Sequence, residues 1–140
     1  ANELLKQEVM VKMTNFNTII DDIFPLADKT EYINALASYQ LLIIDDLGVE
    51  RNSEYALGII FSVIDRRIRS ERPLIITTNL PLKEIKSETM LDKRRIYDRI
   101  LEMCTPMYVG GASKREAIAS MKMEKAKTLL NTNRGEEKCE

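Results

Sequence analysis

Short apolar runs alternate along this chain with longer segments of helical periodicity. Residues 41–44 are all apolar, too few for a helix, and two carboxylates, a leucine and a glycine follow them. This pattern is typical of a buried parallel strand that ends in an acidic pair. Runs rich in β-branched or aromatic residues predict further strands at 9–14, 74–78 and 107–109.

Between these runs, apolar residues recur at helical spacing, most clearly at Leu57, Ile60 and Ile64. Strands that alternate with helices predict an α/β fold: a parallel sheet of about four strands, flanked by helices. We expect one domain over 1–130 and a polar, disordered tail over 131–140. The predicted helices are 15–22, 29–38, 53–70, 93–103 and 114–130, with the end of a further helix at 1–7.

Polar residues at the helix ends support these boundaries. Thr14 or Asn15 can cap the first full helix, Asn52 or Ser53 the long one, and Ser113 the last. Arginines near the end of the long helix complement its dipole, at positions 66, 67 and 69. The residues of the last helix expected to face inward are Ile118, Met121, Ala126 and Leu129 or Leu130.

The composition limits the binding partners and the kinds of catalysis that are possible for this chain. The 140 residues carry a net charge of −1, so no global basic field favours nucleic acid or membrane, and any such contact must be local. Histidine is absent, which excludes Ser-His-Asp and Cys-His catalysis. Cys104 and Cys139 lack metal-site spacing and suit a reducing compartment, so we expect a cytoplasmic protein.

Carboxylates and an amide follow two of the predicted strands. Asp45 and Asp46 end one strand, and Asn79 follows the strand 74–78. The carboxyl ends of parallel strands meet at one edge of a sheet, where ligands bind. A carboxylate there can hold Mg²⁺, its neighbour can polarise water, and an amide can bind a phosphate. The alternative for each is a solvated turn, which Asp and Asn also favour.

Two basic groups are further candidates. Arg95 and Arg99 share a helix face with Arg94 nearby, and arginine's fork of donors suits phosphate oxygens. A solvated face paired with Asp92, Asp98 or Glu102 explains them equally well. Lys114 and Arg115 begin the last helix, where cations oppose the dipole, so a role beyond local stability is indicated.

The order of these motifs is more specific than any one of them. Leu-Leu-Ile-Ile-Asp-Asp-Leu-Gly, Pro-Leu-Ile-Ile-Thr-Thr-Asn-Leu, Arg-Ile-Tyr-Asp-Arg-Ile-Leu and Gly-Gly-Ala-Ser-Lys-Arg-Glu follow one another along the chain. Over residues 1 to about 116 this series resembles the AAA+ ATPases of the DnaC/DnaI helicase-loader group, and the IstB-type transposition helpers are similar.

The resemblance implies a role for each matching residue. Asp45 matches the Walker B acid that binds Mg²⁺, and Asp46 takes the place of the catalytic acid, where many members have Glu. Asn79 matches sensor 1, Arg99 the arginine finger that reaches a neighbouring subunit, and Arg115 sensor 2, which contacts the nucleotide. ATP and Mg²⁺ are the implied cofactors.

One family element has no match. None of the 140 residues fits the phosphate-binding G-x-x-x-x-G-K-[ST] loop, and the chain begins at Ala1 in a helical pattern, as a C-terminal fragment would. We therefore expect this chain by itself not to hydrolyse ATP. In the family, the P-loop strand lies between the sensor 1 strand and the last one. Its absence predicts exposed sheet edges and self-association, or movement of 107–109 to close the gap.

The resemblance also implies partners: a replicative helicase, single-stranded DNA and further copies of the chain. Lys29, Phe24 and Tyr32 are candidates for DNA contact, with core or surface packing as the alternative. An IstB-type transposition helper and a catalytically silent interaction module remain open. A phospho-accepting receiver domain is disfavoured, because its middle strand would need a further Asp where Thr-Thr-Asn stands.

Overall fold

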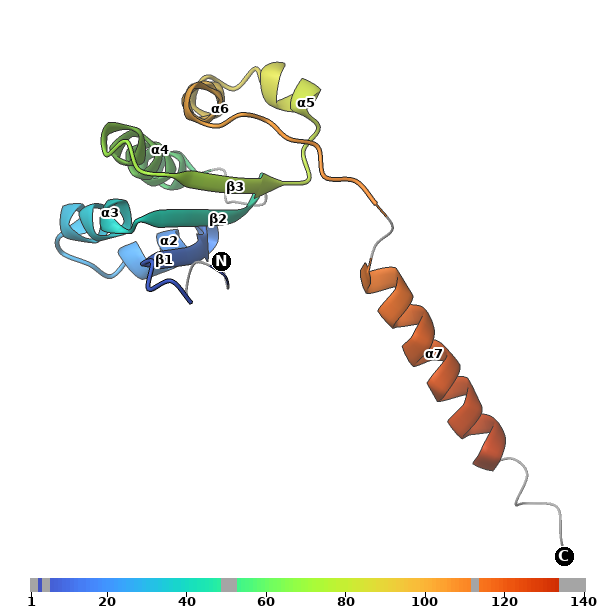
Figure 1. Ribbon diagram of the computed structural model, residues 1–140. Helices are drawn as coiled ribbons and strands as arrows, with labels where there is room; N and C mark the ends of the chain where they lie inside the picture. The colour runs from blue at the N-terminus through green and yellow to red at the C-terminus, as the bar shows by residue number, and fades with distance from the viewer. Residues whose placement is uncertain (1–2, 4–5, 49–52, 112–113, 134–140) are drawn as a thin grey trace, which may run out of the picture. The chain divides into compact units, whose positions relative to one another are not determined.

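Three parallel strands, in the order β1-β2-β3, form the sheet of the computed structural model (Figure 1). The structure describes residue 3 and residues 6–48, 53–111 and 114–133, with the side chains of 118–127 in the last range. The strands are β1 (Val11–Asn15), β2 (Leu41–Leu47) and β3 (Leu74–Thr78). The helices are α2 (Phe16–Ile23), α3 (Lys29–Ser38), α4 (Glu54–Arg69), α5 (Leu82–Lys86), α6 (Leu91–Met103) and α7 (Lys114–Asn133).

The predicted α/β class with a parallel sheet is confirmed, and most element boundaries agree within two residues. The caps follow the expected chemistry: Asn15 Oδ1 accepts the Thr18 amide at 2.9 Å, and Ser53 Oγ accepts the Ala56 amide at 3.2 Å. Helix α5 falls in a stretch interpreted only as polar, and its Ile85 is buried.

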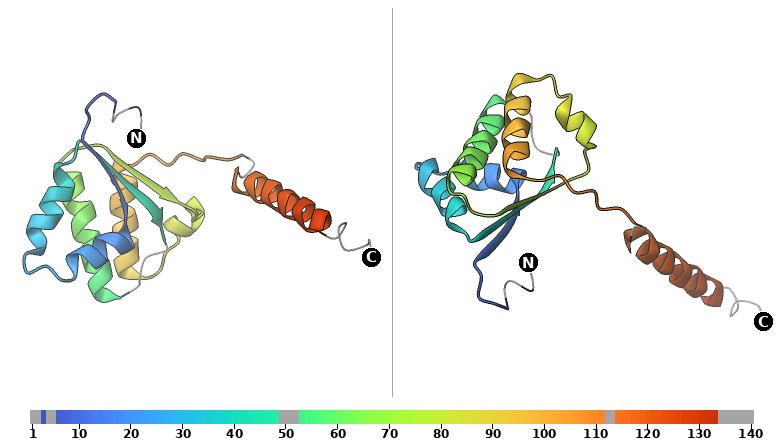
Figure 2. Two further views of the ribbon diagram at one scale, coloured as in Figure 1. Left: turned by 90° about the horizontal axis from the view of Figure 1, so that it is seen from below. Right: turned by 45° about the horizontal axis from the view of Figure 1, so that its top comes forward.

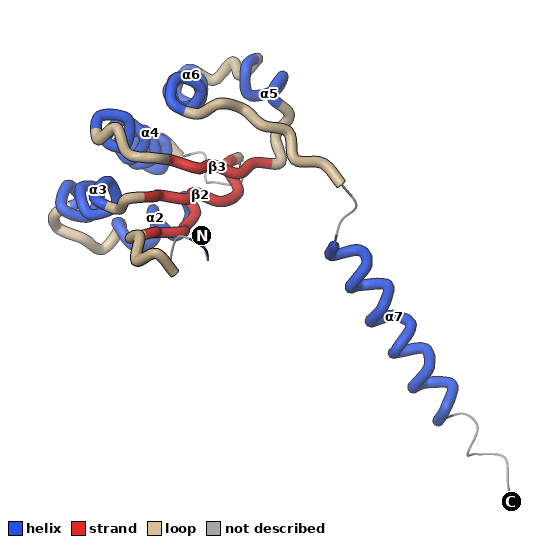
Figure 3. The backbone as a smooth tube through the Cα atoms, in the orientation of Figure 1, coloured by secondary structure: helices blue, strands red, loops and turns tan. Residues whose placement is uncertain are grey.

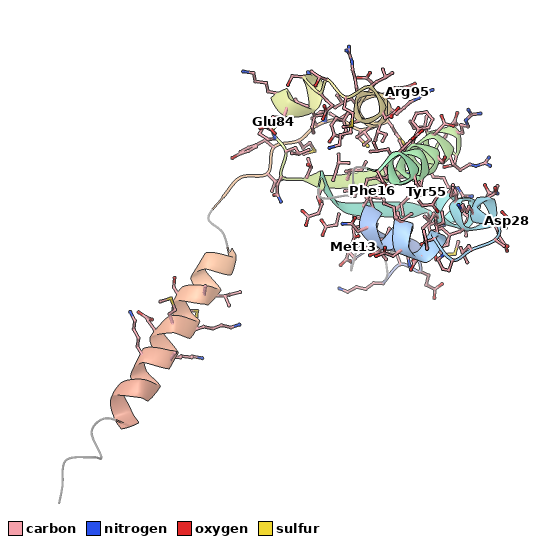
Figure 4. All side chains as sticks on the ribbon, turned by 180° about the vertical axis from the view of Figure 1, so that it is seen from behind. Met13, Phe16, Asp28, Tyr55, Glu84 and Arg95 are labelled. Carbon is pink, nitrogen blue, oxygen red and sulfur yellow. The ribbon has the colours of Figure 1, made fainter. Side chains whose placement is uncertain are left out.

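In the first compact unit, residues 1–106, the helices gather on one face of the sheet (Figure 2). Leu42 and Ile44 of β2 point into the core that α2, α4 and α6 share, whereas Ile43 between them points to the opposite face. There Ile43 pairs in register with Met13 and Ile75, whose side chains are 57% and 48% exposed. In Figure 4, Met13 lies at the edge of this unit and Phe16 within it. Within the described residues the sheet is therefore covered on one side.

Arg67 belongs to the core, although its position near the end of the long helix predicted a cation that complements the helix dipole. Its side chain is fully buried, and its guanidinium donates to the carbonyls of Ala37, Tyr39, Gln40 and Pro73. These carbonyls lie where α3 ends and just before β2 and β3 begin. Arg67 therefore ties the amino ends of two strands to α4.

The prediction of a strand at 107–109 is wrong, so the described sheet has three strands and not four. Figure 3 draws this segment as a loop, and the side chains of Met107, Tyr108 and Val109 are 84–97% exposed. An extended segment becomes a strand only when a neighbour completes its backbone hydrogen bonds. The expected neighbour, a P-loop strand, has no counterpart among the described residues.

The chain divides into two compact units, residues 1–106 and 107–140. Within the second unit taken by itself, the side chains of Ile118, Met121 and Ala126 on α7 are exposed, and their predicted inward orientation stays a prediction. A lone helix offers its apolar side chains no second surface, and α7 is the one helix described in that unit. Leu129 and Leu130 fall among side chains outside the description, as does the cap at Ser113, and a single domain over 1–130 stays a prediction.

At the two ends, the predicted elements fall largely outside the description. Of the expected helix at 1–7, residue 3 is helical and residues 6–8 form a turn. Helix α7 extends three residues into the predicted tail, to Asn133, and 134–140 lie outside the described residues.

Candidate functional site

The acidic pair lies at the carboxyl end of β2, between the ends of β1 and β3. The register pairs Asp45 with Asn15 on β1, while an irregularity between Ile44 and Leu47 interrupts the pairing with β3. Within it, Asp46 has a φ of +61°, in the left-handed region that L-residues other than Asn, Asp and His rarely adopt. The two carboxylates therefore end the strand in a bent, irregular segment, with Asp45 partly buried and Asp46 exposed.

Two side chains at and just after the end of β3, Thr77 and Asn79, contact this bent segment. Thr77 Oγ1 donates a hydrogen bond to Asp45 Oδ1 and accepts one from the Asp46 amide at 3.1 Å. Asn79 Nδ2 donates to Asp46 Oδ1 at 3.3 Å. Asp45, Asp46 and Asn79, predicted to share one sheet edge, do lie together.

A glycine lets the chain leave this edge. Gly48 has a φ of +103°, and a Cβ built on it would lie 2.6 Å from Cδ1 of Leu80. A side chain at this position would therefore be strained and would displace Leu80, which follows Asn79. Next to the glycine, Thr78 Oγ1 donates to the Leu47 carbonyl at 2.7 Å and accepts the Leu80 amide at 3.0 Å.

A cleft of about 360 Å³ opens beside the two carboxylates. Asp45 and Asp46 form one wall, and the first turn of α2 forms the other. The lining residues are Asn15, Phe16, Asn17, Thr18, Asp21, Asp45 and Asp46. The site thus offers solvent-accessible oxygen ligands beside a helix start, with room for a small polar group.

The oxygen donors fit a Mg²⁺ ion. Magnesium prefers hard oxygen ligands, keeps several waters and is held by one or two carboxylates together with substrate phosphates. Asp45 and Asp46 supply two carboxylates, and no group of three His, Cys, Asp or Glu side chains arranged for a metal is found among the described residues. A magnesium ion at this edge would therefore need ligands from a nucleotide and water.

The structure does not bring the predicted arginines to this edge. Arg99 on α6 donates to Glu102 at 2.9 Å and lies 3.8 Å from Asp65 on α4. Nearby, Arg95 lies over the ring of Phe61, with Cζ 5.0 Å from the ring centroid, and is labelled in Figure 4. The backbone of Arg115 belongs to α7, but its side chain lies outside the described residues.

Two residues that contribute to this edge, Thr77 and Leu80, were not predicted from the sequence. The Thr-Thr-Asn sequence predicts a role for Asn79, because this residue matches the sensor 1 position. Thr77 lies two residues earlier, and alternation along β3 places it on the same face as Ile75. Predicting the role of Thr77 requires the register of β3 against β2, which a single sequence does not provide.

The sequence profile described as IstB-like ATP binding protein matches residues 18–122. The replicative helicase loader DnaC of Escherichia coli (strain K12) is 33% identical over 105 residues, which cover 71% of this chain and 42% of that protein. DnaC of Buchnera aphidicola subsp. Acyrthosiphon pisum (strain APS) is 36% identical over 67 residues, 46% of this chain and 27% of that protein. The chain thus spans less than half the length of these relatives.

Two solved structures share the fold. The crystal structure of DnaI superposes with a TM-score of 0.64 and 21% identity, covering 79% of this chain and 60% of that one. AMPPCP-bound DnaA from Aquifex aeolicus reaches a TM-score of 0.50 at 17% identity, over 67% of this chain and 31% of that one. Over the described residues, no helix is long and apolar enough to cross a membrane. Profile, relatives and fold agree, and the chain belongs to the IstB-like ATP-binding protein family, the DnaC/IstB type of AAA+ ATPase.

Proposed function

We propose that this chain belongs to an ATPase that loads a replicative helicase onto single-stranded DNA in the cytoplasm, as part of a primosome. The observation that carries the proposal is the cluster of Asp45, Asp46 and Asn79 at one strand edge. The similarity of this chain to DnaC, a replicative helicase loader, supports a replicative helicase as the partner.

In this proposal each residue of the cluster has one task. ATP would supply the γ-phosphoryl group, and its Mg²⁺ ion would neutralise negative charge on the phosphate oxygens. Asp45 would hold the Mg²⁺ ion through a carboxylate oxygen, and Asp46 would orient the attacking water and accept its proton. Asn79 Nδ2, 3.3 Å from Asp46 Oδ1, lies where its amide can contact both the water and a phosphate oxygen. Arg115 would contact the nucleotide in the same subunit.

Arg99 is the proposed arginine finger for a neighbouring subunit. Its side chain is 42% exposed and is held by Glu102 and Asp65 of its own chain. The exposed pair with Glu102 contributes little to stability, so exchanging it for a phosphate costs little. Arg95, held over Phe61, and Arg94, 4.0 Å from Asp98, are the alternatives on the same helix.

A second surface suits single-stranded DNA. The Phe24 ring is 74% exposed and meets Tyr55 edge to face at 6.2 Å, and Lys29 Nζ lies 4.6 Å above the Tyr55 ring. Exposed rings stack bases and a lysine neutralises the backbone, so Phe24, Tyr55 and Lys29 form the proposed DNA surface. Tyr32 is less suited, because its hydroxyl donates to Asp22 at 2.8 Å.

The ATPase is tested on the gene product that contains this chain, with Asp46→Asn as the variant and Asp92→Asn as the control. Asp46→Asn should lower turnover at least about 100-fold and retain nucleotide binding. Asp92 lies in the first turn of α6, is exposed and does not line the cleft beside Asp46. Asp92→Asn should therefore hydrolyse ATP at the wild-type rate. Equal turnover by all three proteins would exclude the proposed role of Asp46.

The DNA surface is tested by fluorescence anisotropy with a labelled poly(dT) strand. Phe24→Ala should weaken binding about tenfold, since stacking of one base contributes roughly 1–3 kcal/mol. Leu26→Ala removes a neighbouring exposed side chain and should leave binding unchanged. Loss of affinity in both variants, or in neither, would argue against a stacking role for Phe24.

Self-association is the third part of the proposal. In the described sheet β1 and β3 are the outer strands, and an outer strand presents unpaired backbone groups. Sedimentation of residues 1–140 should therefore show dimers or larger species. A monomer at every concentration tested would contradict this expectation.

A transposition helper is the second candidate function, because the matching profile is that of IstB-like proteins. Copurification distinguishes the two: a loader should retain a hexameric replicative helicase, and a transposition helper a transposase. A catalytically silent interaction module would retain a partner but show no ATP-dependent step.

A further inference from the structure

One hydroxyl lies between the two carboxylates of the site. Thr77 Oγ1 donates a hydrogen bond to Asp45 Oδ1 and accepts one from the Asp46 amide at 3.1 Å. A threonine hydroxyl has one donor and two acceptor positions, so it can serve both neighbours at once. Thr77 therefore links the side chain of one acid to the backbone of the next.

These bonds act on a segment with unfavourable backbone geometry. The φ of +61° at Asp46 has an intrinsic cost and persists only where surrounding contacts determine it. The Thr77 bond to the Asp46 amide and the Asn79 bond to its carboxylate are such contacts. Without the hydroxyl, the amide loses this partner and the bend can relax toward regular strand geometry.

The bond to Asp45 has a separate consequence. A donor on Oδ1 limits rotation of the carboxylate about its last side-chain bond. A carboxylate oriented in advance loses less entropy when it binds a cation, which is how outer-shell partners tune metal sites. Thr77 can thus affect ion binding and water orientation through two different bonds.

We infer that Thr77 is a positioning residue for both acids: it orients Asp45 for the metal ion and holds Asp46 in its left-handed conformation. The inference rests on the proposed ATPase function and deepens it. Thr77 itself need not touch nucleotide, ion or water. Its effect should appear in turnover and in the requirement for Mg²⁺, and much less in nucleotide affinity.

The test uses the gene product that contains this chain, with Thr77→Val, Thr77→Ser and Thr78→Val. Valine keeps the threonine shape without the hydroxyl, and serine keeps the hydroxyl. Thr78→Val is the matched control, because the Thr78 hydroxyl bonds the main chain of Leu47 and Leu80 and neither carboxylate. Both valine variants lose one hydroxyl from the same strand.

Thr77→Val should lower kcat about 10- to 100-fold, with the KM for ATP within about twofold of wild type. Binding of a fluorescent ATP analogue should need about fivefold more Mg²⁺ for half saturation. Hydrogen exchange at the Asp46 amide should be at least about tenfold faster, since its acceptor is gone. Thr77→Ser should restore all three readouts, and Thr78→Val should keep kcat within about twofold.

Wild-type kcat and Mg²⁺ requirement in Thr77→Val would overturn the inference. An equal loss of kcat in Thr78→Val, or no rescue by Thr77→Ser, would also overturn it, because the effect would then be general to the strand. Failure of the proposed function has a different signature: the wild type itself would hydrolyse no ATP, or Asp46→Asn would leave turnover unchanged. The exchange rate at Asp46 would still report whether Thr77 holds the bend.

Discussion

Replacing Arg67 with methionine tests the core contact that a sequence pattern misassigned. The Arg67 side chain is fully buried, and both terminal nitrogens of its guanidinium donate to main-chain carbonyls. Methionine fills most of the volume of the aliphatic stem and donates nothing. The substitution therefore removes the hydrogen bonds with little change in apolar packing.

The expected loss follows from the four acceptors. Ala37 and Tyr39 accept at 2.9 and 2.8 Å, and Gln40 accepts at 3.4 Å. The Pro73 carbonyl also accepts the Leu42 amide at 3.3 Å, so it is not left without a donor. Three acceptors, one buried and two partly buried, at about 1 kcal/mol each suggest a loss of roughly 3 kcal/mol. Burial and the neighbouring Arg72 lower the pKa of Arg67, so the folded state also bears a charging cost that methionine relieves.

Urea unfolding of residues 1–140, followed by circular dichroism, measures this loss. In a thermal scan of the same variant, a loss of about 3 kcal/mol corresponds to a fall in Tm of about 10–20 °C for a unit of this size. Arg69→Met is the matched control: Arg69 is 72% exposed and pairs with Asp65 one turn earlier, so it should cost below about 0.5 kcal/mol. If Arg67→Met lost no more than this control, the carbonyl contacts would not stabilise the fold as argued.

Three further expectations concern the edge of the site, alkaline stability and the isolated chain. Gly48→Ala should cost about 1–3 kcal/mol in urea unfolding, because it places a Cβ at a φ of +103° and 2.6 Å from Leu80 Cδ1. Gly58→Ala, where nothing lies within 4 Å, should be neutral or stabilising inside α4, and equal losses would refute the steric argument. Burial and the bond to Asp22 raise the pKa of Tyr32 above its ordinary value of 10.0. The unfolded chain then releases the phenol proton first, so stability should fall as pH rises above about 10, and less steeply in Tyr32→Phe; identical slopes would contradict this. Residues 1–140 alone should show no ATP turnover above background in a phosphate-release assay, since no residue run matches the phosphate-binding loop, and turnover abolished by Asp46→Asn would refute that.

Sequence alone determined the α/β class, the positions of β2 and β3 and the shared edge of Asp45, Asp46 and Asn79. Local rules suffice for these features: apolar runs bounded by polar residues form buried strands, and parallel strands bring their carboxyl ends together. The caps at Asn15 and Ser53 followed from the same local chemistry.

Tertiary structure alone decided where Arg67, Thr77 and residues 107–109 belong. Helical periodicity places Arg67 on the buried face of α4, three residues after Ile64, and Arg69 off that face. The carbonyls that accept hydrogen bonds from Arg67 lie about 30 positions away in the chain, so its burial with partners could not be predicted locally. The contacts of Thr77 with Asp45 and Asp46 depend on the register of β3 against β2 and on its irregularity at Asp46. Residues 107–109 have strand-like side chains but pair with no strand in the described structure. Periodicity reports which side chains prefer burial, whereas contacts between distant segments depend on how the elements pack, and that information is spread over the whole chain.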